Sequence, residues 1–373
     1  MAGQPPRQPT RPPGSWARTT GPPGAPLTEG TAVTVSIDES TSLRQAREIA
    51  DEVFFPAALA VDAADRVPIS HLDLLAEHGF YGLAAPPEFN RLDLPSFPAV
   101  CRVIETLASG CLTTTFLWAQ HHNAVMAAAN TGNAELRAAW LEPLATGQRR
   151  AGLAIGAAVR PGPAALSATP VDGGFLFSGA APWVSGWGLV DTIYVAARVS
   201  DDTLVFALVD AATSDTLTVE PLRMSAVNAS STVTVTFDNH FVPADRVANQ
   251  MPLEAWRQRD PATLRFNGSL ALGVADRAIE LADEPRLRSQ LDAVRDRLDS
   301  ADPETMPAAR AAASELALRA SANLAVAAGS RAVLLDQHAQ RLVREATFLL
   351  VFGSRPGIRD ALHTTLTTSP GVA

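Results

Sequence analysis

The sequence predicts a mainly α-helical protein with a β module inserted between two helical regions. Apolar residues recur at helical spacing from about Ser42 to Gly147. Between residues 150 and 247 the pattern changes to short strands separated by turns. From Pro252 to the C-terminus the spacing is helical again, with the Ala, Leu and Arg content of packed helices. We therefore expect the order helices, β module, helices.

The composition is that of a globular chain without a nucleic-acid or membrane partner. The 373 residues are 47% hydrophobic and 18% charged, which suffices for a large core. A net charge of −9 and the lack of a basic cluster argue against a nucleic-acid surface. No run of about 18 apolar residues occurs, so no membrane span is expected. All 30 basic residues are Arg, which excludes Schiff-base chemistry on a lysine of this chain.

We expect four regions along the chain. Residues 1–35 are rich in Pro and Gly and are expected to form a disordered tail, although their Arg content also resembles a transit peptide. The N-terminal helical domain is expected over residues 36–149, the β domain over 150–248 and the C-terminal helical bundle over 249–373. The two cysteines, at positions 101 and 111, form no metal motif or disulfide framework, which indicates a reducing cytoplasm and no metal site.

In the N-terminal region, glycines mark the expected ends of helices. A short helix over residues 71–79 is closed by Gly79, and a helix over 134–144 is followed by Gly147. Another helix is expected over 100–107. The segment 113–129 has few charges and many apolar residues, so we expect it to be a central helix.

The β module and the last region have their own expected elements. Turns such as Asp172-Gly173-Gly174 separate the strands and suggest a small antiparallel sandwich or barrel. The strands are expected at 152–155, 175–177, 192–198, 203–209, 217–221 and 233–237. The later helices are expected at 265–283, 285–298, 306–338 with a break near Gly329, 341–351 and 358–366.

The segment Ala180–Asp191 is the first candidate for a binding site. It places Trp183 and Ser185 between two expected strands, beside flexible glycines. An indole can lie against the face of a planar ring, while a hydroxyl and backbone N–H groups donate to ring heteroatoms. The alternative is that Trp183 is a core residue of the β module.

Several segments together resemble the acyl-CoA dehydrogenase superfamily over residues 42–366. Gly132–Gly147 is similar to the family's helix before the β domain, and Phe237–Pro243 to the Phe-x-x-x-x-Val-Pro end of that domain. Arg344-Glu345-Ala346 resembles the Arg-Asp-Ala start of the last catalytic-region helix. Trp183-Val184-Ser185 is similar to the segment that contacts the flavin ring. The resemblance implies a flavoprotein oxidoreductase that binds FAD through Trp183, Val184 and Ser185 and desaturates an acyl thioester at its α,β-bond.

The sequence departs from this family at places that carry its chemistry. Desaturation requires a base that removes the α-proton. In the family this base is usually a glutamate in a turn, but here Phe352-Gly353-Ser354 stands in the place of that turn, and Thr263 stands at the alternative glutamate position. The Arg-x-x-Phe-Gly segment that holds the FAD pyrophosphate is replaced by the short Glu284–Arg288. Ile155-Gly156-Ala157 replaces Thr-Glu-Pro, and residues around 336–338 replace Gln-x-x-Gly-Gly. These changes imply loose FAD binding or altered chemistry.

A second branch of the superfamily, two-component monooxygenases that use reduced FMN or FAD and oxygen, is also indicated. Ser185-Gly186 is similar to the Ser-Gly whose hydroxyl lies near flavin N5 in those enzymes, and His121-His122 resembles a His pair that faces their pocket. Ser185, His121 and His122 are therefore the candidate catalytic residues, and the substrate would be an aromatic compound or another secondary metabolite. The alternative for the pair is that one His packs between helices and the other meets solvent, since adjacent helix positions lie about 100° apart.

Two further expectations concern function and assembly. The scaffold could have lost flavin and serve as a binding module or a non-redox enzyme, because a fold does not fix a function. Helices 306–338 and 341–351 are more apolar than a solvent-facing pair, which predicts a homodimer or homotetramer. The resemblance implies the same assembly, because the family's flavin sites lie beside a subunit interface.

Overall fold

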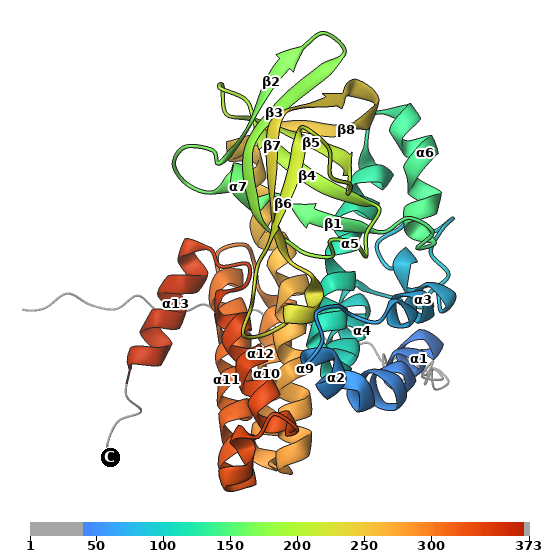
Figure 1. Cartoon of the computed structure of the whole chain (residues 1–373). Coiled ribbons are helices and arrows are strands. Elements are labelled where there is room, and N and C mark those ends of the chain that lie inside the picture. The colour runs from blue at the N-terminus through green and yellow to red at the C-terminus, as the bar shows by residue number, and fades with distance from the viewer. Residues whose placement is uncertain (1–39, 369–373) are drawn as a thin grey trace, which may run out of the picture. The chain divides into compact units, whose positions relative to one another are not determined.

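The computed structural model describes residues 40–368, except for the side chain of Ala262, and confirms the predicted order of helices, sheet and helices (Figure 1). The expected tail over residues 1–35 lies outside the described residues. Within the described part of the chain, no helix is both long enough and apolar enough to cross a bilayer.

The N-terminal helices begin and end at the signals in the sequence. The Ser40 hydroxyl accepts the N–H of Leu43 and starts the first helix, as expected of an N-cap serine. Gly79 and Gly147 follow their helices with φ of +76°, which confirms both as stops. The helices are α1 (Thr41–Glu48), α2 (Phe55–Asp62), α3 (Ile69–Glu77), α4 (Phe97–Gly110), α5 (Leu112–Asn130) and α6 (Ala134–Ala145), with a π-helical segment, Ile49–Phe54, between α1 and α2.

Helix α5 is central, as its low charge predicted. Every residue from Leu112 to His122 is buried. The helix contacts α4, α6 and α9 and also the first strand of the sheet, so it lies between the helical parts and the β module. A helix surrounded in this way needs apolar or internally satisfied side chains on all of its faces.

The β module is one eight-stranded sheet with the order β6-β7-β3-β2-β4-β5-β8, and β1 also pairs with β4. Most strand pairs are antiparallel, as expected, but β4 pairs in parallel with β1 and at one position with β2, so the sheet is mixed. The β2–β3 hairpin and a short helix, α7 (Gly156–Val159), form the crossover that this parallel β1–β4 pairing requires. The strands are β1 (Ala151–Ala154), β2 (Leu166–Val171), β3 (Gly174–Val184), β4 (Thr192–Arg198), β5 (Thr203–Asp210), β6 (Leu217–Pro221), β7 (Val233–Pro243) and β8 (Val247–Pro252).

The C-terminal helices pack against one another and against α4 (Figure 1). Gly273 permits the close approach of α9 to α4, since a Cβ at this position would lie 2.3 Å from the Glu105 carbonyl oxygen. The predicted break near Gly329 is confirmed by a 3₁₀ segment, Gly329–Val333. The helices are α8 (Leu253–Arg259), α9 (Leu264–Ala282), α10 (Pro285–Ser300), α11 (Met306–Ala328), α12 (His338–Val351) and α13 (Pro356–Thr367).

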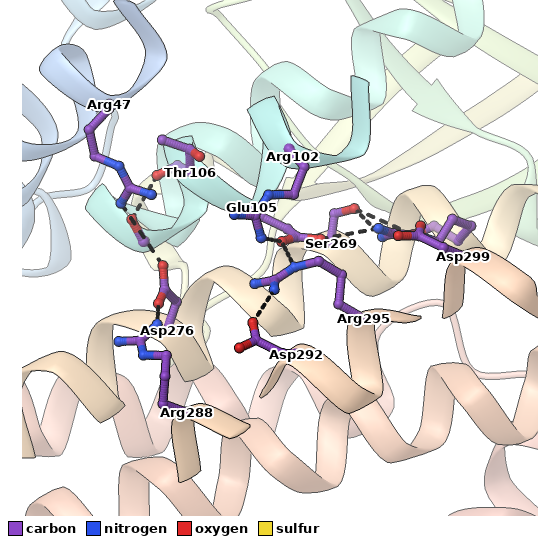
Figure 2. A network of polar contacts seen from close by, with 12 residues as sticks. Arg47, Arg102, Glu105, Thr106, Ser269, Asp276, Arg288, Asp292, Arg295 and Asp299 are labelled. Carbon is purple, nitrogen blue, oxygen red and sulfur yellow. Dashed lines mark hydrogen bonds and ion pairs between the residues drawn. The ribbon is translucent and has the colours of Figure 1, made fainter. Parts of the chain in front are cut away.

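A buried charge network joins the N-terminal helices to the C-terminal bundle (Figure 2). Glu105 of α4, only 4% exposed, accepts hydrogen bonds from Arg265 of α9 at 3.2 Å and from Arg295 of α10 at 2.8 Å. Arg102 also donates to it at 3.0 Å. Asp299 takes a second N–H of Arg265, at 2.6 Å. One carboxylate therefore ties three helices together.

Candidate functional site

A β-bulge presents Trp183 at the end of β3. Ala181 pairs with Val235 and Val184 with Val233, so Pro182 and Trp183 stand opposite the single residue Thr234. Bulges of this kind re-aim a side chain and are frequent beside functional sites. Trp183 has φ of +69° and is 56% exposed, whereas Val184 is fully buried. A non-glycine residue in this strained conformation, with its indole in solvent, does not behave as the core residue that was the alternative.

The Ser185 hydroxyl belongs to a buried chain of three hydroxyl groups. Ser185 Oγ lies 2.8 Å from Thr232 Oγ1, which lies 2.8 Å from Ser230 Oγ. All three residues are at most 3% exposed. Thr232 and Ser230 were missed in the sequence, because 47 residues separate Ser185 from Thr232 and only the pairing of β3 with β7 brings them together.

The segment 222–232 between β6 and β7 is held by all three parts of the fold. Its Ser230 carbonyl accepts the N–H of Gly186 at 2.8 Å, and its Ala229 carbonyl accepts the N–H of Val67 at 2.8 Å. Arg344 of α12 donates to its Ser225 carbonyl at 2.6 Å. Gly186 itself has φ of +92°, and a Cβ there would lie 2.7 Å from Leu117 of α5. The Ser185–Gly186 turn is thus fixed against both the segment and α5.

His121 of α5 is a structural residue. The backbone N–H of Ala151 donates to its Nδ1 at 3.0 Å, so the proton is on Nε2, which donates to the Leu144 carbonyl at 2.9 Å. Burial lowers the pKa of His121 to about 4. Both nitrogens are used in joining α5, α6 and β1, and the ring is neutral. The geometry leaves His121 no nitrogen for a substrate.

His122 is in a different situation. It is fully buried, and neither ring nitrogen has a hydrogen-bond partner. Its ring meets Trp118 edge-on at 4.6 Å between centroids and lies 6.1 Å from Phe266 of α9. Burial lowers its pKa well below the usual value, so this imidazole is neutral. The alternative that one member of the pair meets solvent was wrong, because α5 is buried at every position from Leu112 to His122.

Aromatic rings occupy the place where the family's carboxylate was expected. Phe352 lies 5.0 Å from Phe116 and 5.4 Å from Phe348 between ring centroids. A Cβ on Gly353 would face the side-chain nitrogen of Asn267 at 3.6 Å. Thr263, at the alternative position, donates its hydroxyl to the Asp260 carbonyl at 2.8 Å. Neither position offers a proton acceptor of carboxylate strength.

A buried carboxylate does lie about two turns earlier, on α12. Glu345 accepts a hydrogen bond from Arg341 at 2.7 Å, and both side chains are at most 2% exposed. Burial raises the pKa of Glu345, and the Arg341 guanidinium opposes that shift. A carboxylate sealed in an ion pair is poorly placed to take a proton from a substrate.

Two cavities of the described structure lie away from these residues. One of about 410 Å³ is lined by the segments 162–170 and 198–202 of the β module, and one of about 250 Å³ lies beside Arg265 and Asp299. Neither lining includes Trp183, Ser185 or His122. Among residues 40–368, no group of three or more His, Cys, Asp or Glu side chains could hold a metal ion.

Comparison with known proteins gives one consistent result. The family model "acyl-CoA dehydrogenase, N-terminal domain" matches residues 37–148. Benzylmalonyl-CoA dehydrogenase of Aromatoleum aromaticum is 28% identical over 242 residues, which are 61% of this chain and 63% of that protein. The match thus spans less than two thirds of that relative's length.

Solved structures share the fold. Butyryl-CoA dehydrogenase of Megasphaera elsdenii superposes with a TM-score of 0.77 and 14% identity, covering 89% of this chain and 98% of that one. A glutaryl-CoA dehydrogenase of Mycobacterium smegmatis in complex with FADH2 superposes with a TM-score of 0.73 and 15% identity, covering 89% of this chain and 95% of that one. Likeness at this identity establishes the fold alone. Together with the family model over residues 37–148 and the benzylmalonyl-CoA dehydrogenase match, it shows that the chain has the acyl-CoA dehydrogenase fold and is similar to members of that superfamily.

Proposed function

We propose that this protein is a flavin-dependent oxidoreductase of the acyl-CoA dehydrogenase type that acts on a small organic molecule. The observation that carries the proposal is the bulge that holds the Trp183 indole in solvent, two residues before the Ser185 hydroxyl. The flavin is FAD, bound loosely or used in reduced form as FAD or FMN. A cytoplasmic location is part of the proposal, and the buried free thiols of Cys101 and Cys111 fit a reducing compartment.

The residues present fit the ring of a flavin. Trp183 offers an exposed indole face. The hydroxyls of Ser185, Thr232 and Ser230 contain three hydrogens but make two hydrogen bonds with one another, so one hydrogen remains, and it is on Ser185 when Ser230 donates to Thr232 and Thr232 to Ser185. The phosphate end has less support. Only Asp283 and Glu284 link α9 to α10, and Arg288 on α10 is paired with Asp276. This connection thus has two carboxylates and no arginine that could bind the pyrophosphate of FAD, which favours loose binding of the dinucleotide.

A bound flavin would supply the hydride acceptor, or in its reduced form the reaction with oxygen. The chain's own residues would set the ring in place: Trp183 against one face and Ser185 as donor at a ring heteroatom. For α,β-desaturation of an acyl thioester, a base must also remove the α-proton. Phe352, Thr263 and the ion-paired Glu345 do not provide it. A dehydrogenase built on this site therefore needs a base other than the family's carboxylate.

A two-component monooxygenase is the second candidate, and the state of His122 favours it. Oxygen insertion does not need a carboxylate base, and a neutral imidazole with two unused nitrogens can bond a polar substrate or an oxygen atom. Oxygen reactivity distinguishes the two. Mixing the protein and reduced flavin with oxygen should give a transient absorbance absent from flavin alone if the protein is an oxygenase. Bleaching of oxidised bound flavin by an acyl-CoA would instead identify a dehydrogenase.

Trp183→Ala should weaken the binding of FAD by about tenfold or more, because the ring loses its aromatic contact. The matched control is Trp187→Ala, since Trp187 packs on the core of the β module and should matter less for FAD affinity. Both affinities can be measured by titration of flavin fluorescence. Equal weakening in the two variants would remove Trp183 from the site.

The partner of this chain is proposed to be a second copy, in a homodimer or homotetramer. Val326, Val333 and Leu335, at the end of α11 and just after it, are 81%, 79% and 81% exposed. Apolar side chains grouped in this way are usually covered by a partner. Light scattering should give a multiple of the 39.3 kDa chain mass, and Leu335→Glu should lower it. A wild-type mass near 39.3 kDa contradicts the proposed assembly.

A further inference from the structure

The cavity of about 250 Å³ lies where α4, α9 and α11 begin and α10 ends. Its walls come from the first turn of α4, from the start of α9 and the segment before it, from the last turn of α10 and from the connection to α11. Pockets for drug-sized ligands usually measure about 300–1,000 Å³, so this cavity fits a smaller molecule.

Most of the cavity wall is apolar and rigid. Three of the lining residues are prolines, Pro98, Pro261 and Pro303, whose rings fix the backbone angle φ. The Leu298 side chain is buried, whereas the ring of Phe97 is 52% exposed and open to contact. Walls of this kind lose little conformational freedom when a ligand binds, and they can cover an apolar ring or chain.

The polar end of the cavity is the carboxylate of Asp299. Its Oδ1 accepts a hydrogen bond from Arg265 Nε at 2.6 Å, while its Oδ2 has no partner among residues 40–368. The two other nitrogens of the Arg265 guanidinium donate to Ser269 at 2.8 Å and to Glu105 at 3.2 Å. The carboxylate is therefore held in place with one oxygen open, and the arginine beside it is already engaged on all three nitrogens.

The charge of the lining favours a cation. The lining holds one arginine, Arg265, and two aspartates, Asp299 and Asp302, which is a net charge of −1. Asp302 uses its Oδ1 to accept the N–H groups of Glu304 at 3.0 Å and Thr305 at 2.8 Å. An anion would meet two carboxylates and no free arginine, whereas an ammonium group can donate a charge-assisted hydrogen bond to Asp299.

We propose that this cavity binds a small organic ammonium ion. Its N–H groups donate to the open oxygen of Asp299, and its apolar body lies against Phe97 and Leu298. The site is separate from Trp183 and does not depend on the proposed flavin function. Because the ligand contacts the ends of α4, α9, α10 and α11, its binding also stabilises the packing of these helices.

Benzylammonium is the probe, because it joins one ammonium group to a small flat apolar ring. Its neutral counterpart benzyl alcohol and the anion benzoate are the comparison ligands. We expect benzylammonium to bind the full chain saturably, about tenfold more tightly than benzyl alcohol at neutral pH and low ionic strength, and benzoate not to bind. Isothermal titration calorimetry measures the affinities, and benzylammonium should also raise the Tm.

Three variants locate the ligand. Asp299→Asn keeps the shape of the side chain and should weaken benzylammonium binding about tenfold, with little effect on benzyl alcohol. Asp292→Asn is the matched control, since Asp292 is 60% exposed on the same helix and does not line the cavity. Ala301→Phe places a ring in the cavity without changing any charge, should abolish binding, and serves if Asp299→Asn does not fold.

A preference for benzylammonium that is lost in Asp299→Asn and kept in Asp292→Asn supports the site. The absence of saturable benzylammonium binding overturns the proposal. So does equal affinity for benzylammonium and benzyl alcohol, because the carboxylate then contributes nothing. Wild-type affinity in Asp299→Asn or in Ala301→Phe places the ligand elsewhere and overturns it as well.

Discussion

Glu105→Gln should lower the free energy of unfolding by about 3–5 kcal/mol, the usual cost of removing one partner from a buried ion pair. The amide keeps the shape of the carboxylate but leaves the charge of Arg265, 2% exposed, without its partner on α4. Arg295 and Arg102 lose the same partner. Because these arginines come from three helices, the substitution also weakens the docking of α4 on the bundle (Figure 2).

Asp292→Asn is the matched control for this experiment. Asp292 bonds the same Arg295 at 2.6 Å, but its side chain is 60% exposed, and exposed pairs contribute about 0–1 kcal/mol. Urea unfolding followed by circular dichroism compares the two variants. A loss for Glu105→Gln no larger than that for Asp292→Asn would mean that the network does not hold the helices together.

Acid should destabilise the protein between pH 6.5 and about 4 by about 3 kcal/mol through His121 alone. Burial lowers the pKa of His121 to about 4, so the folded state keeps this ring neutral where the unfolded chain binds a proton. The stability that depends on the neutral ring is fully present above pH 6.5 and is lost as the pH falls toward 4. Burial also lowers the pKa of His122, which adds to the loss in the same direction.

The slope of stability against pH measures this effect. Urea unfolding midpoints should fall as the pH decreases from 7 to 4.5. In His121→Gln the stability should depend less steeply on pH, because up to one fewer proton is taken up on unfolding. The substitution also costs baseline stability, because Gln cannot bridge the Ala151 N–H and the Leu144 carbonyl as the imidazole does. A wild-type midpoint that does not change over this range would contradict the neutral, buried state of the pair.

Local signals in the sequence predicted much of the fold. Strands 192–198 and 217–221 have the predicted bounds, and the helix stops at Gly79 and Gly147 follow from backbone chemistry that glycine alone meets readily. Strands β2 and β8 were missed, because Pro170 and the polar run Asn249-Gln250 weaken the alternation that identifies a strand. The parallel pairing of β1 with β4 was missed because pairing direction depends on the path of the whole chain.

The site was less accessible from the sequence. The sequence identified Trp183 and Ser185 as a pair, but the bulge separates them, one in solvent and one buried. The different fates of His121 and His122 depend on Leu144, Ala151 and Phe266, which the fold brings from other elements. One signal was available: α5 has no Asp, Glu or Arg and its apolar residues are spread around the helix, which predicts burial on most of its faces. A solvent-facing His was therefore already unfavourable.

Whether this protein binds a flavin is tested by titrating the purified wild-type protein with FAD and FMN, each in oxidised and in reduced form. We expect saturable binding, a changed visible spectrum on binding, and a larger loss of affinity in Trp183→Ala than in Trp187→Ala. A colourless protein that leaves the fluorescence and spectrum of all four flavins unchanged would contradict flavin binding, and the scaffold would then be a binding module or a non-redox enzyme.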